Sequence, residues 1–349
     1  MLLNTITRLS PLLERNPFDK ILCYEPTNPQ YSPRFPLSAE LRNYQRGGIE
    51  YIRHLCRYNL NCALCDEMGL GKTLQALCVV TEHALDLSPR KAKILVICPA
   101  SLIYVWSLEI NKFGFDKILD VFADANQFIA APDTSHKVLV ISYRSSALQS
   151  DRLSSLVWDY LVLDEAHFVR NPNTQTFLNI KLVKANHTLA LSGTPLQNRV
   201  TDLWALFDIL NPGLIEENAK TFRSKFERPL KGSLRSLAEN KNLAKKQTFV
   251  KALKELQNRV APFILRRVKE DVLGDLPPRI LEDYFCTPSQ SQIEAIERAE
   301  EDGGLSLEDV AEQKLGEGVK GKREVGILKS LLTHRKLASH PSLACWKQR

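Results

Sequence analysis

The segment 66–73 constrains the fold of this chain more than any other feature of its sequence. It reads Asp-Glu-Met-Gly-Leu-Gly-Lys-Thr and lies between an apolar run, residues 61–65, and a predicted helix, residues 73–87. This order is typical of a phosphate-binding loop, because glycines let main-chain N–H groups close around phosphate oxygens and the helix start adds its positive dipole end. Lys72 would reach the outer phosphates, and the Thr73 hydroxyl would bind Mg²⁺. The segment predicts a site for ATP or GTP, although Asp66 stands where the loop template has glycine.

Apolar runs that alternate with helical stretches predict the fold class. The expected strands are residues 61–65, 93–98, 138–142, 160–164 and 188–192. The helical stretches between and after them are residues 73–87, 102–113, 174–183 and 203–210. This alternation predicts an α/β fold with a parallel sheet flanked by helices. Ligands of such sheets bind beyond the carboxyl ends of the strands, so the polar residues that follow each run should meet beside the phosphate loop.

A pair of carboxylates follows the apolar run 160–163. Asp164, at the end of a buried strand, would hold Mg²⁺ directly or through water. Glu165 would orient and activate the attacking water. His167 is either a core histidine or a relay between the magnesium site and the turn 192–194, and we favour the relay. That turn, Ser192, Gly193 and Thr194, offers hydroxyls and a flexible backbone that could sense the γ-phosphate.

The distribution of charge points to one basic segment. The chain of 349 residues has a net charge of +7, but residues 223–269 hold 14 Lys and Arg against 3 Asp and Glu, a net charge of +11. A nucleic-acid partner and a solvated helical face both explain this excess. No apolar run approaches the roughly 18 residues of a membrane span, and the N-terminus does not resemble a secretory signal. The eight cysteines are best interpreted as buried thiols in a reducing compartment.

In this order the motifs resemble the SWI/SNF-type ATPases of helicase superfamily two. The matching segments are 41–45 (adenine motif), 66–73 (motif I, with Asp first as is usual in the family), 99–106 (motif Ia), 142–143, 164–167 (motif II, the DEAH box) and 191–198 (motif III). The resemblance extends over residues 37–345. Within the family, residues 40–44, 59–77 and 262–286 look most like the members that remove TATA-binding protein from DNA, although the N-terminal helical repeats of those members are absent here.

The resemblance implies a nuclear, monomeric RecA-like lobe that couples ATP hydrolysis to tracking along double-stranded DNA, with Mg²⁺ as cofactor and TATA-binding protein as a partner through the missing repeats. It implies five parts: a leader or linker (1–36), the ATP-binding lobe (37–215), a helical basic protrusion and brace (216–290), a polar mobile connection (291–326) and the beginning of a second lobe (327–349). The implied catalytic residues are Lys72, Asp164, Glu165 and His167, with Thr73 and Asp164 on Mg²⁺ and Ser192, Gly193 and Thr194 in coupling.

Two larger sets of binding residues also follow from the resemblance. The ATP-binding set is Arg42, Gln45, Asp66, Glu67, Met68, Gly69, Leu70, Gly71, Lys72 and Thr73. A glutamine amide such as that of Gln45 can donate to and accept from an adenine edge together. The DNA-binding set is Pro99, Ala100, Ser101, Ser142, Tyr143, Asn198, Lys241, Lys245, Lys246, Arg266 and Arg267. Arg266 and Arg267 either face DNA or brace the lobe.

The family's second lobe supplies arginine fingers, and residues 337–343 resemble only its beginning. An arginine finger is worth ~10³ or more in rate, so we expect this chain to be a fragment that binds nucleotide but hydrolyses it poorly. Two other functions stay open. One is a docking module whose affinity for DNA or a protein depends on its nucleotide state. The other is an RNA-directed helicase lobe. The amino-acid sequence of residues 66–73 and the basic segment 223–269 both argue against it.

Overall fold

The computed structural model describes residues 29–193, 200–230, 243–274, 282, 284, 286–301 and 322–340. The chain divides into two compact units, residues 1–276 and 277–349. A seven-stranded sheet forms the centre of the first unit, with the order β3-β4-β2-β5-β6-β1-β7 and parallel pairing throughout. The strands are β1 (Cys62–Leu64), β2 (Lys93–Cys98), β3 (Leu119–Phe122), β4 (His136–Ser142), β5 (Val157–Leu163), β6 (Lys184–Leu191) and β7 (Ile264–Leu265). The predicted parallel α/β sheet is confirmed, with β3 and β7 as unpredicted edge strands.

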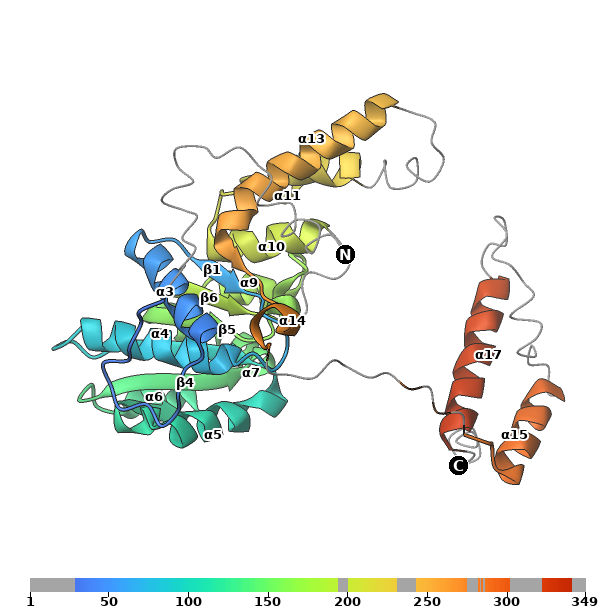
Figure 1. The fold of residues 1–349 in the computed structure, drawn as a ribbon, viewed down its shortest axis with the longest axis horizontal. Helices are drawn as coiled ribbons and strands as arrows, with labels where there is room; N and C mark the ends of the chain where they lie inside the picture. The colour runs from blue at the N-terminus through green and yellow to red at the C-terminus, as the bar shows by residue number, and fades with distance from the viewer. Residues whose placement is uncertain are drawn as a thin grey trace. The chain divides into compact units, whose positions relative to one another are not determined.

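Helices cover both faces of this sheet (Figure 1). Successive strand residues point to opposite faces, and the apolar side chains accordingly fall into two buried clusters, with Leu95 and Ile97 in one and Ile94 and Val96 in the other. The second cluster is closed by α3 (Asn43–Arg57), α4 (Lys72–Asp86) and α5 (Ile103–Phe113). The first is closed by α6 (Ala125–Ala130), α7 (Tyr143–Leu148), α8 (Ser150–Ser155), α9 (Gln175–Lys181) and α10 (Val200–Leu210).

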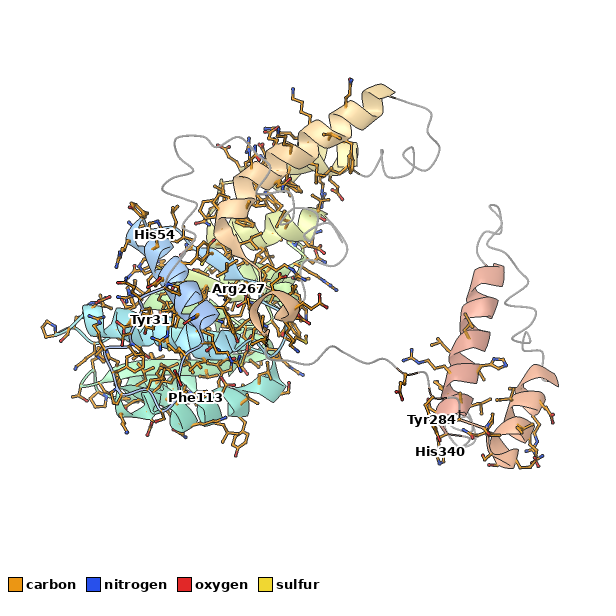
Figure 2. The ribbon with its side chains drawn as sticks, in the orientation of Figure 1. Tyr31, His54, Phe113, Arg267, Tyr284 and His340 are labelled. Atoms are coloured by element: carbon orange, nitrogen blue, oxygen red, sulfur yellow. The ribbon has the colours of Figure 1, made fainter. Side chains whose placement is uncertain are left out.

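The end of the segment interpreted as a leader packs on this lobe. Tyr31, labelled in Figure 2, and Phe35 are both buried in the cluster beneath α3 and α4. The Arg34 guanidinium donates to the fully buried carboxylate of Glu82 on α4 at 2.5 Å, and the Arg34 main-chain N–H donates to the same carboxylate at 2.9 Å. A buried carboxylate requires such partners. Residues 29–36 are therefore part of the folded lobe and not a separate linker.

The basic segment belongs to a helical extension of the lobe, in which Figure 1 labels α11 and α13. The described elements of this extension are α11 (Ala219–Phe222), a π-helical turn (Arg223–Glu227), α13 (Leu243–Val260), a 3₁₀ turn (Ala261–Phe263) and α14 (Lys269–Val272). Part of its positive charge is neutralised internally, because Glu255 accepts from Lys225 at 2.8 Å and from Arg259 at 2.9 Å. Lys251 and Lys254 are exposed on α13. The carboxyl-terminal part of α13 is thus buried and ion-paired against the lobe, and the part around Lys251 and Lys254 carries exposed positive charge.

The second unit contains two packed helices, α15 (Gln290–Glu301) and α17 (Lys322–Ser339). The Gln292 side chain donates to the main-chain oxygens of Leu337, at 3.2 Å, and Ala338, at 3.0 Å. The predicted polar connection, residues 291–326, is therefore helical at both of its described ends, and residues 302–321 lie outside the described residues. Among the helices that the structure describes, none is long and apolar enough to cross a membrane.

Candidate nucleotide-binding site

Main-chain hydrogen bonds hold the carboxyl ends of neighbouring strands together beyond the sheet. Ser192 N–H donates to Leu64 O at 3.1 Å, which joins the ends of β6 and β1. Asp164 N–H donates to Ile97 O at 2.8 Å, which joins the ends of β5 and β2. The segments that follow these strands are thus gathered at one edge of the sheet, as expected for the ligand-binding edge of a parallel α/β fold.

The loop after β1 has the backbone of a phosphate-binding loop. Gly69 and Gly71 have φ values of +87° and +73°, a region that side chains with a Cβ rarely adopt. Helix α4 begins at Lys72, whose ammonium donates to the main-chain oxygens of Asp66, at 3.0 Å, and Glu67, at 3.3 Å. Burial lowers the pKa of Lys72, although three carboxylates oppose this shift, those of Asp66, Glu165 and Asp164. The loop therefore presents a half-buried cation beside the helix start.

The Asp164 carboxylate is buried and fixed in orientation at the end of β5. One carboxylate oxygen accepts from the Trp106 indole N–H of α5 at 2.9 Å, and the other accepts from the Glu165 main-chain N–H at 2.9 Å. Burial raises the pKa of Asp164, and the Trp106 hydrogen bond opposes that shift. Glu165 itself has a left-handed backbone with φ of +51°, which is costly for a residue with a Cβ. Strained residues of this kind cluster at functional sites.

The donor set at this edge suits magnesium. Mg²⁺ is usually held by one or two carboxylate or hydroxyl oxygens, with phosphate oxygens and water completing six ligands. Asp164 supplies a carboxylate, and Thr73 supplies a half-buried hydroxyl in the first turn of α4. Within the described residues, no group of three or more His, Cys, Asp or Glu could hold a metal ion. The site therefore fits an ion that arrives with phosphate and not a protein-enclosed metal.

Glu165 and His167 form a second polar pair at this edge. The His167 Nδ1 atom lies 3.1 Å from a Glu165 carboxylate oxygen, and the His167 ring lies against the Phe168 ring with centroids 4.7 Å apart. His167 is about two-fifths exposed, so it is not a core histidine. His167 contacts Glu165, on the side of the predicted magnesium site. The other half of the relay, toward the turn 192–194, remains a prediction, because Thr194 lies outside the described residues.

The turn after β6 approaches the phosphate loop closely. A Cβ atom added to Gly193 would lie 2.6 Å from the Met68 side chain and 3.3 Å from the Lys72 ammonium. Ser192 is buried beside it. The structure thus places Gly193 against the loop with Ser192 next to it in the chain, and the coupling role of both residues remains a prediction.

Three side chains of the expected ATP-binding set contact or are buried in the protein itself. Asp66 is fully buried and ion-paired with Arg267, and the Glu67 carboxylate accepts from the Lys269 main-chain N–H at 2.8 Å. The Leu70 side chain is also fully buried. These three side chains hold the loop in place from the protein side, which leaves the main chain, Lys72 and Thr73 as the groups of the loop that are predicted to bind phosphate.

Gln45 is buried on α3. Its side-chain oxygen accepts from the Arg42 main-chain N–H at 3.0 Å, and its amide nitrogen donates to Leu70 O at 3.4 Å. A Cβ atom on Gly71 would lie 2.5 Å from this amide nitrogen. Gln45 therefore packs directly on the phosphate loop, and Arg42 lies exposed at the start of α3. Their contact with adenine remains a prediction.

Two expected DNA contacts are engaged inside the protein. The Ser142 hydroxyl accepts from Ser145 N–H at 3.0 Å and caps α7. The Tyr143 hydroxyl donates to Asp164 O at 2.8 Å, and its buried ring stacks on Phe168 with centroids 4.9 Å apart. Ser142 thus caps a helix, and Tyr143 supports the strand end that carries Asp164. The contact of these two residues with DNA phosphates remains a prediction.

The other expected DNA contacts divide three ways. Ala100 and Ser101 are exposed after β2, with Pro99 half-buried beside them. Asn198 and Lys241 lie outside the described residues, and Lys245 and Lys246 lie on α13, with their side chains outside the description. Arg266 is half-buried, and one terminal guanidinium nitrogen has no hydrogen-bond partner among the described residues. Arg267 is bound to Asp66, so the structure favours the bracing alternative for this residue.

Trp106 belongs to this site, but the sequence analysis assigned it no role. It lies in the segment 99–106 that resembles motif Ia, but nothing in that segment shows that its indole N–H reaches the end of another strand. The available signal is the tryptophan itself, because a buried indole N–H usually has a hydrogen-bond partner.

The comparisons with known proteins agree with this geometry. The profile of the family described as "SNF2-related domain" matches residues 44–343. The chain belongs to the SNF2-related family. It is 35% identical over 326 residues to the TATA-binding protein-associated factor mot1 of Aspergillus fumigatus, covering 88% of this chain and 16% of that protein. It is 32% identical over 343 residues to the human TATA-binding protein-associated factor 172, covering 91% of this chain and 18% of that protein.

A solved structure shows the same fold. The Sulfolobus solfataricus SWI2/SNF2 ATPase core in complex with dsDNA superposes on the chain with a TM-score of 0.58 and 30% identity, covering 90% of this chain and 61% of that one. This SNF2-related chain therefore has the RecA-like lobe of an SWI2/SNF2 ATPase core. It spans less than a fifth of the length of the two TATA-binding protein-associated factors.

Proposed function

We propose that this chain is the ATP-binding lobe of an ATP-dependent double-stranded DNA translocase that remodels protein–DNA complexes. We propose further that the target removed from DNA is TATA-binding protein, and that the protein acts in the nucleus. The observation that carries the ATP-binding part is the gathering of Lys72, Asp164 and Glu165 at one edge of the sheet, where all three are held in defined orientations. The SNF2-related family and the names of the relatives support the rest.

The chain's own residues divide the work of ATP hydrolysis. Main-chain N–H groups of the loop and the Lys72 ammonium bind the phosphates and offset their charge. Thr73 and Asp164 would hold Mg²⁺, which supplies further neutralisation of the phosphate oxygens. Glu165 orients the attacking water and accepts its proton, and His167, 3.1 Å away, fixes the Glu165 carboxylate. The Trp106 indole N–H keeps the Asp164 carboxylate in one rotamer.

DNA would meet the same edge of the lobe and the basic extension. The exposed residues Ala100 and Ser101 can offer main-chain N–H and hydroxyl groups to phosphates, contacts that position a duplex but do not read its sequence. Lys251 and Lys254 on α13 add positive charge, as Lys245 and Lys246 would. Asn198 and Lys241 complete the proposed set.

Turnover with and without a second lobe tests this function. We expect the chain alone to bind Mg²⁺ and ATP but to hydrolyse ATP slowly, and the chain joined to the second lobe of an SNF2-related relative to hydrolyse it ~10³-fold faster on duplex DNA, because arginine fingers act at this order of magnitude. DNA affinity that changes with nucleotide without restored turnover would favour the docking module. Stimulation by RNA and not by duplex DNA would favour the RNA helicase lobe.

The salt dependence of DNA binding tests the basic helix. The double variant Lys251→Gln and Lys254→Gln should bind duplex DNA more weakly, and the slope of log affinity against log salt should fall by up to about 2, because each neutralised phosphate contributes about 0.9. The matched control is Lys112→Gln with Lys117→Gln. These two lysines are exposed and lie close to β3, at the opposite edge of the sheet. Equal losses in the two double variants would show that α13 is not the DNA-binding element.

A further inference from the structure

Asp66 stands where the phosphate-loop template has glycine, and its environment gives it a different task from binding phosphate. The side chain is fully buried. A carboxylate near phosphates would repel them, and a buried carboxylate is costly unless it is paired and hydrogen-bonded. The partner of Asp66 therefore determines what this position does.

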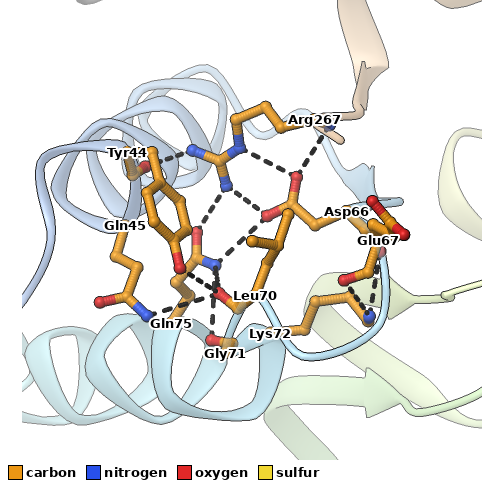
Figure 3. Close-up of polar contacts among 9 residues, drawn as sticks. All are labelled: Tyr44, Gln45, Asp66, Glu67, Leu70, Gly71, Lys72, Gln75 and Arg267. Atoms are coloured by element: carbon orange, nitrogen blue, oxygen red, sulfur yellow. Dashed lines mark hydrogen bonds and ion pairs between the residues drawn. The ribbon is translucent and has the colours of Figure 1, made fainter. Parts of the chain in front are cut away.

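That partner is Arg267, which is 201 residues away in sequence and follows β7 (Figure 3). Arg267 donates to one Asp66 carboxylate oxygen through its side-chain Nε at 2.9 Å and its main-chain N–H at 3.1 Å, and a terminal nitrogen is ion-paired with the other oxygen. A planar guanidinium that contacts both carboxylate oxygens fixes direction as well as charge.

The rest of the guanidinium is bound by two helices of the lobe. It donates to Gln75 Oε1 on α4 at 2.8 Å and to Tyr44 O on α3, and it lies 5.3 Å from the centre of the Tyr44 ring. Gly48 on α3 gives it room, since a Cβ atom there would lie 2.8 Å from Arg267 and 2.1 Å from Gln75. Arg267 is thus locked between α3, α4 and the first residue of the loop.

The same helices hold the far end of the loop. The Tyr44 hydroxyl donates to Leu70 O at 3.3 Å, and the Gln75 amide donates to it at 3.4 Å (Figure 3). Arg267 therefore contacts Asp66 directly and, through Tyr44 and Gln75, the two side chains that hold Leu70. One guanidinium contributes to the positions of both ends of the phosphate-binding loop.

The main chain around Arg267 runs along the loop as an extension of β7. Cys65 N–H donates to Leu265 O at 2.7 Å, Glu67 N–H donates to Arg267 O at 3.0 Å, and Lys269 N–H donates to the Glu67 carboxylate at 2.8 Å. Helix α13 ends at Val260, and the 3₁₀ turn Ala261–Phe263 joins it to β7. The chain that leaves the basic helix is therefore hydrogen-bonded to the phosphate loop.

We propose that Arg267 is a positioning residue for nucleotide binding: by fixing Asp66, it sets the path of residues 66–71 and so the affinity of the loop for nucleotide phosphates. The proposal deepens the proposed function and depends on nucleotide binding by this lobe. It assigns Asp66 a structural partner in place of a ligand, and it makes the segment after α13 part of the nucleotide site.

The test measures the affinity of the whole chain for ADP with Mg²⁺, using a fluorescent ADP, at a temperature where circular dichroism shows every variant folded. Arg267→Lys keeps the buried positive charge but lacks the planar fork, so it should fold and yet bind ADP about 10-fold or more weakly, as small misplacements of a binding group do. Asp66→Asn should lose a similar factor. The two residues act through one contact. The loss of ADP affinity in the double variant should therefore be no greater than the larger of the two losses in the single variants.

The matched control is Arg90→Lys. Arg90 is ion-paired with the buried Asp159 at the amino end of β5, away from the loop, so its loss can affect stability but should leave ADP affinity unchanged. Unchanged ADP affinity in Arg267→Lys, additive losses in the double variant, or an equal loss in Arg90→Lys would each overturn the proposal. Failure of the unchanged chain to bind ADP would instead refute nucleotide binding itself, and the positioning role with it.

Discussion

Replacing Lys72 by alanine is expected to abolish ATP binding at nucleotide concentrations that saturate the unchanged chain. The ammonium already donates to two loop oxygens, those of Asp66 and Glu67, so it lies inside the loop that would surround the phosphates. Hydrogen bonds to charged groups contribute about 1.5–3 kcal/mol each, and the loss of two such contacts to phosphate corresponds to an affinity loss of about 100-fold or more. Calorimetric titration of ATP with Mg²⁺ measures it.

The fold should not suffer from this change. Burial lowers the pKa of Lys72, which means that the protein interior disfavours its charge. Lys72→Ala removes that unfavourable desolvation, so its thermal midpoint should equal or exceed that of the unchanged chain, in line with the trade-off between activity and stability at binding sites. The control is Lys117→Ala, an exposed lysine at the far edge of the sheet, which should retain ATP affinity. Retained ATP affinity in Lys72→Ala would show that the loop is not a phosphate site.

The sequence predicted the sheet and the strand ends because both depend on local patterns. Apolar runs such as residues 93–98 match β2 at both ends, and the glycines of residues 69 and 71 have the positive φ that the loop requires. The carboxyl-end rule then placed Asp164 correctly beside Lys72, since all strands of a parallel sheet end at one edge. These predictions needed only the order of elements, which the sequence carries directly.

What the sequence could not predict depends on contacts between distant residues. Strand β7 has two residues and no periodicity, and its membership in the sheet follows only from pairing with β1 across some 200 positions. The direction of Arg267 depends on that pairing. The sequence predicted that Tyr143 follows a strand at the carboxyl edge of the sheet. It could not predict whether the Tyr143 hydroxyl points to solvent or, as in the structure, to Asp164 O. Tyr31 and Phe35 are buried, but they lie in a proline-rich segment whose composition is typical of an exposed linker.

Replacing Glu165 by glutamine, in the chain joined to a second lobe, is expected to preserve ATP affinity and to lower DNA-stimulated hydrolysis by ~10²–10⁴-fold, the usual contribution of a general base. The amide has nearly the same shape and its oxygen can keep the contact with His167, which is 3.1 Å in length. The hydrogen bond to Asp164 comes from the Glu165 main-chain N–H, so the magnesium carboxylate should keep its orientation. Only the ability to accept a proton is lost.

Glu109→Gln provides the matched control for this variant. Glu109 is a half-buried carboxyl on α5 whose pKa is raised by burial, with a further contribution from Asp164, so its replacement makes the same change of atoms near the same carboxylate. It should alter hydrolysis much less than Glu165→Gln does, because nothing in its position makes it a proton acceptor for water. Normal hydrolysis in Glu165→Gln would refute the water-activating role. Loss of ATP binding in that variant would mean that Glu165 holds the nucleotide or its metal, and its left-handed backbone would then serve binding and not the chemical step.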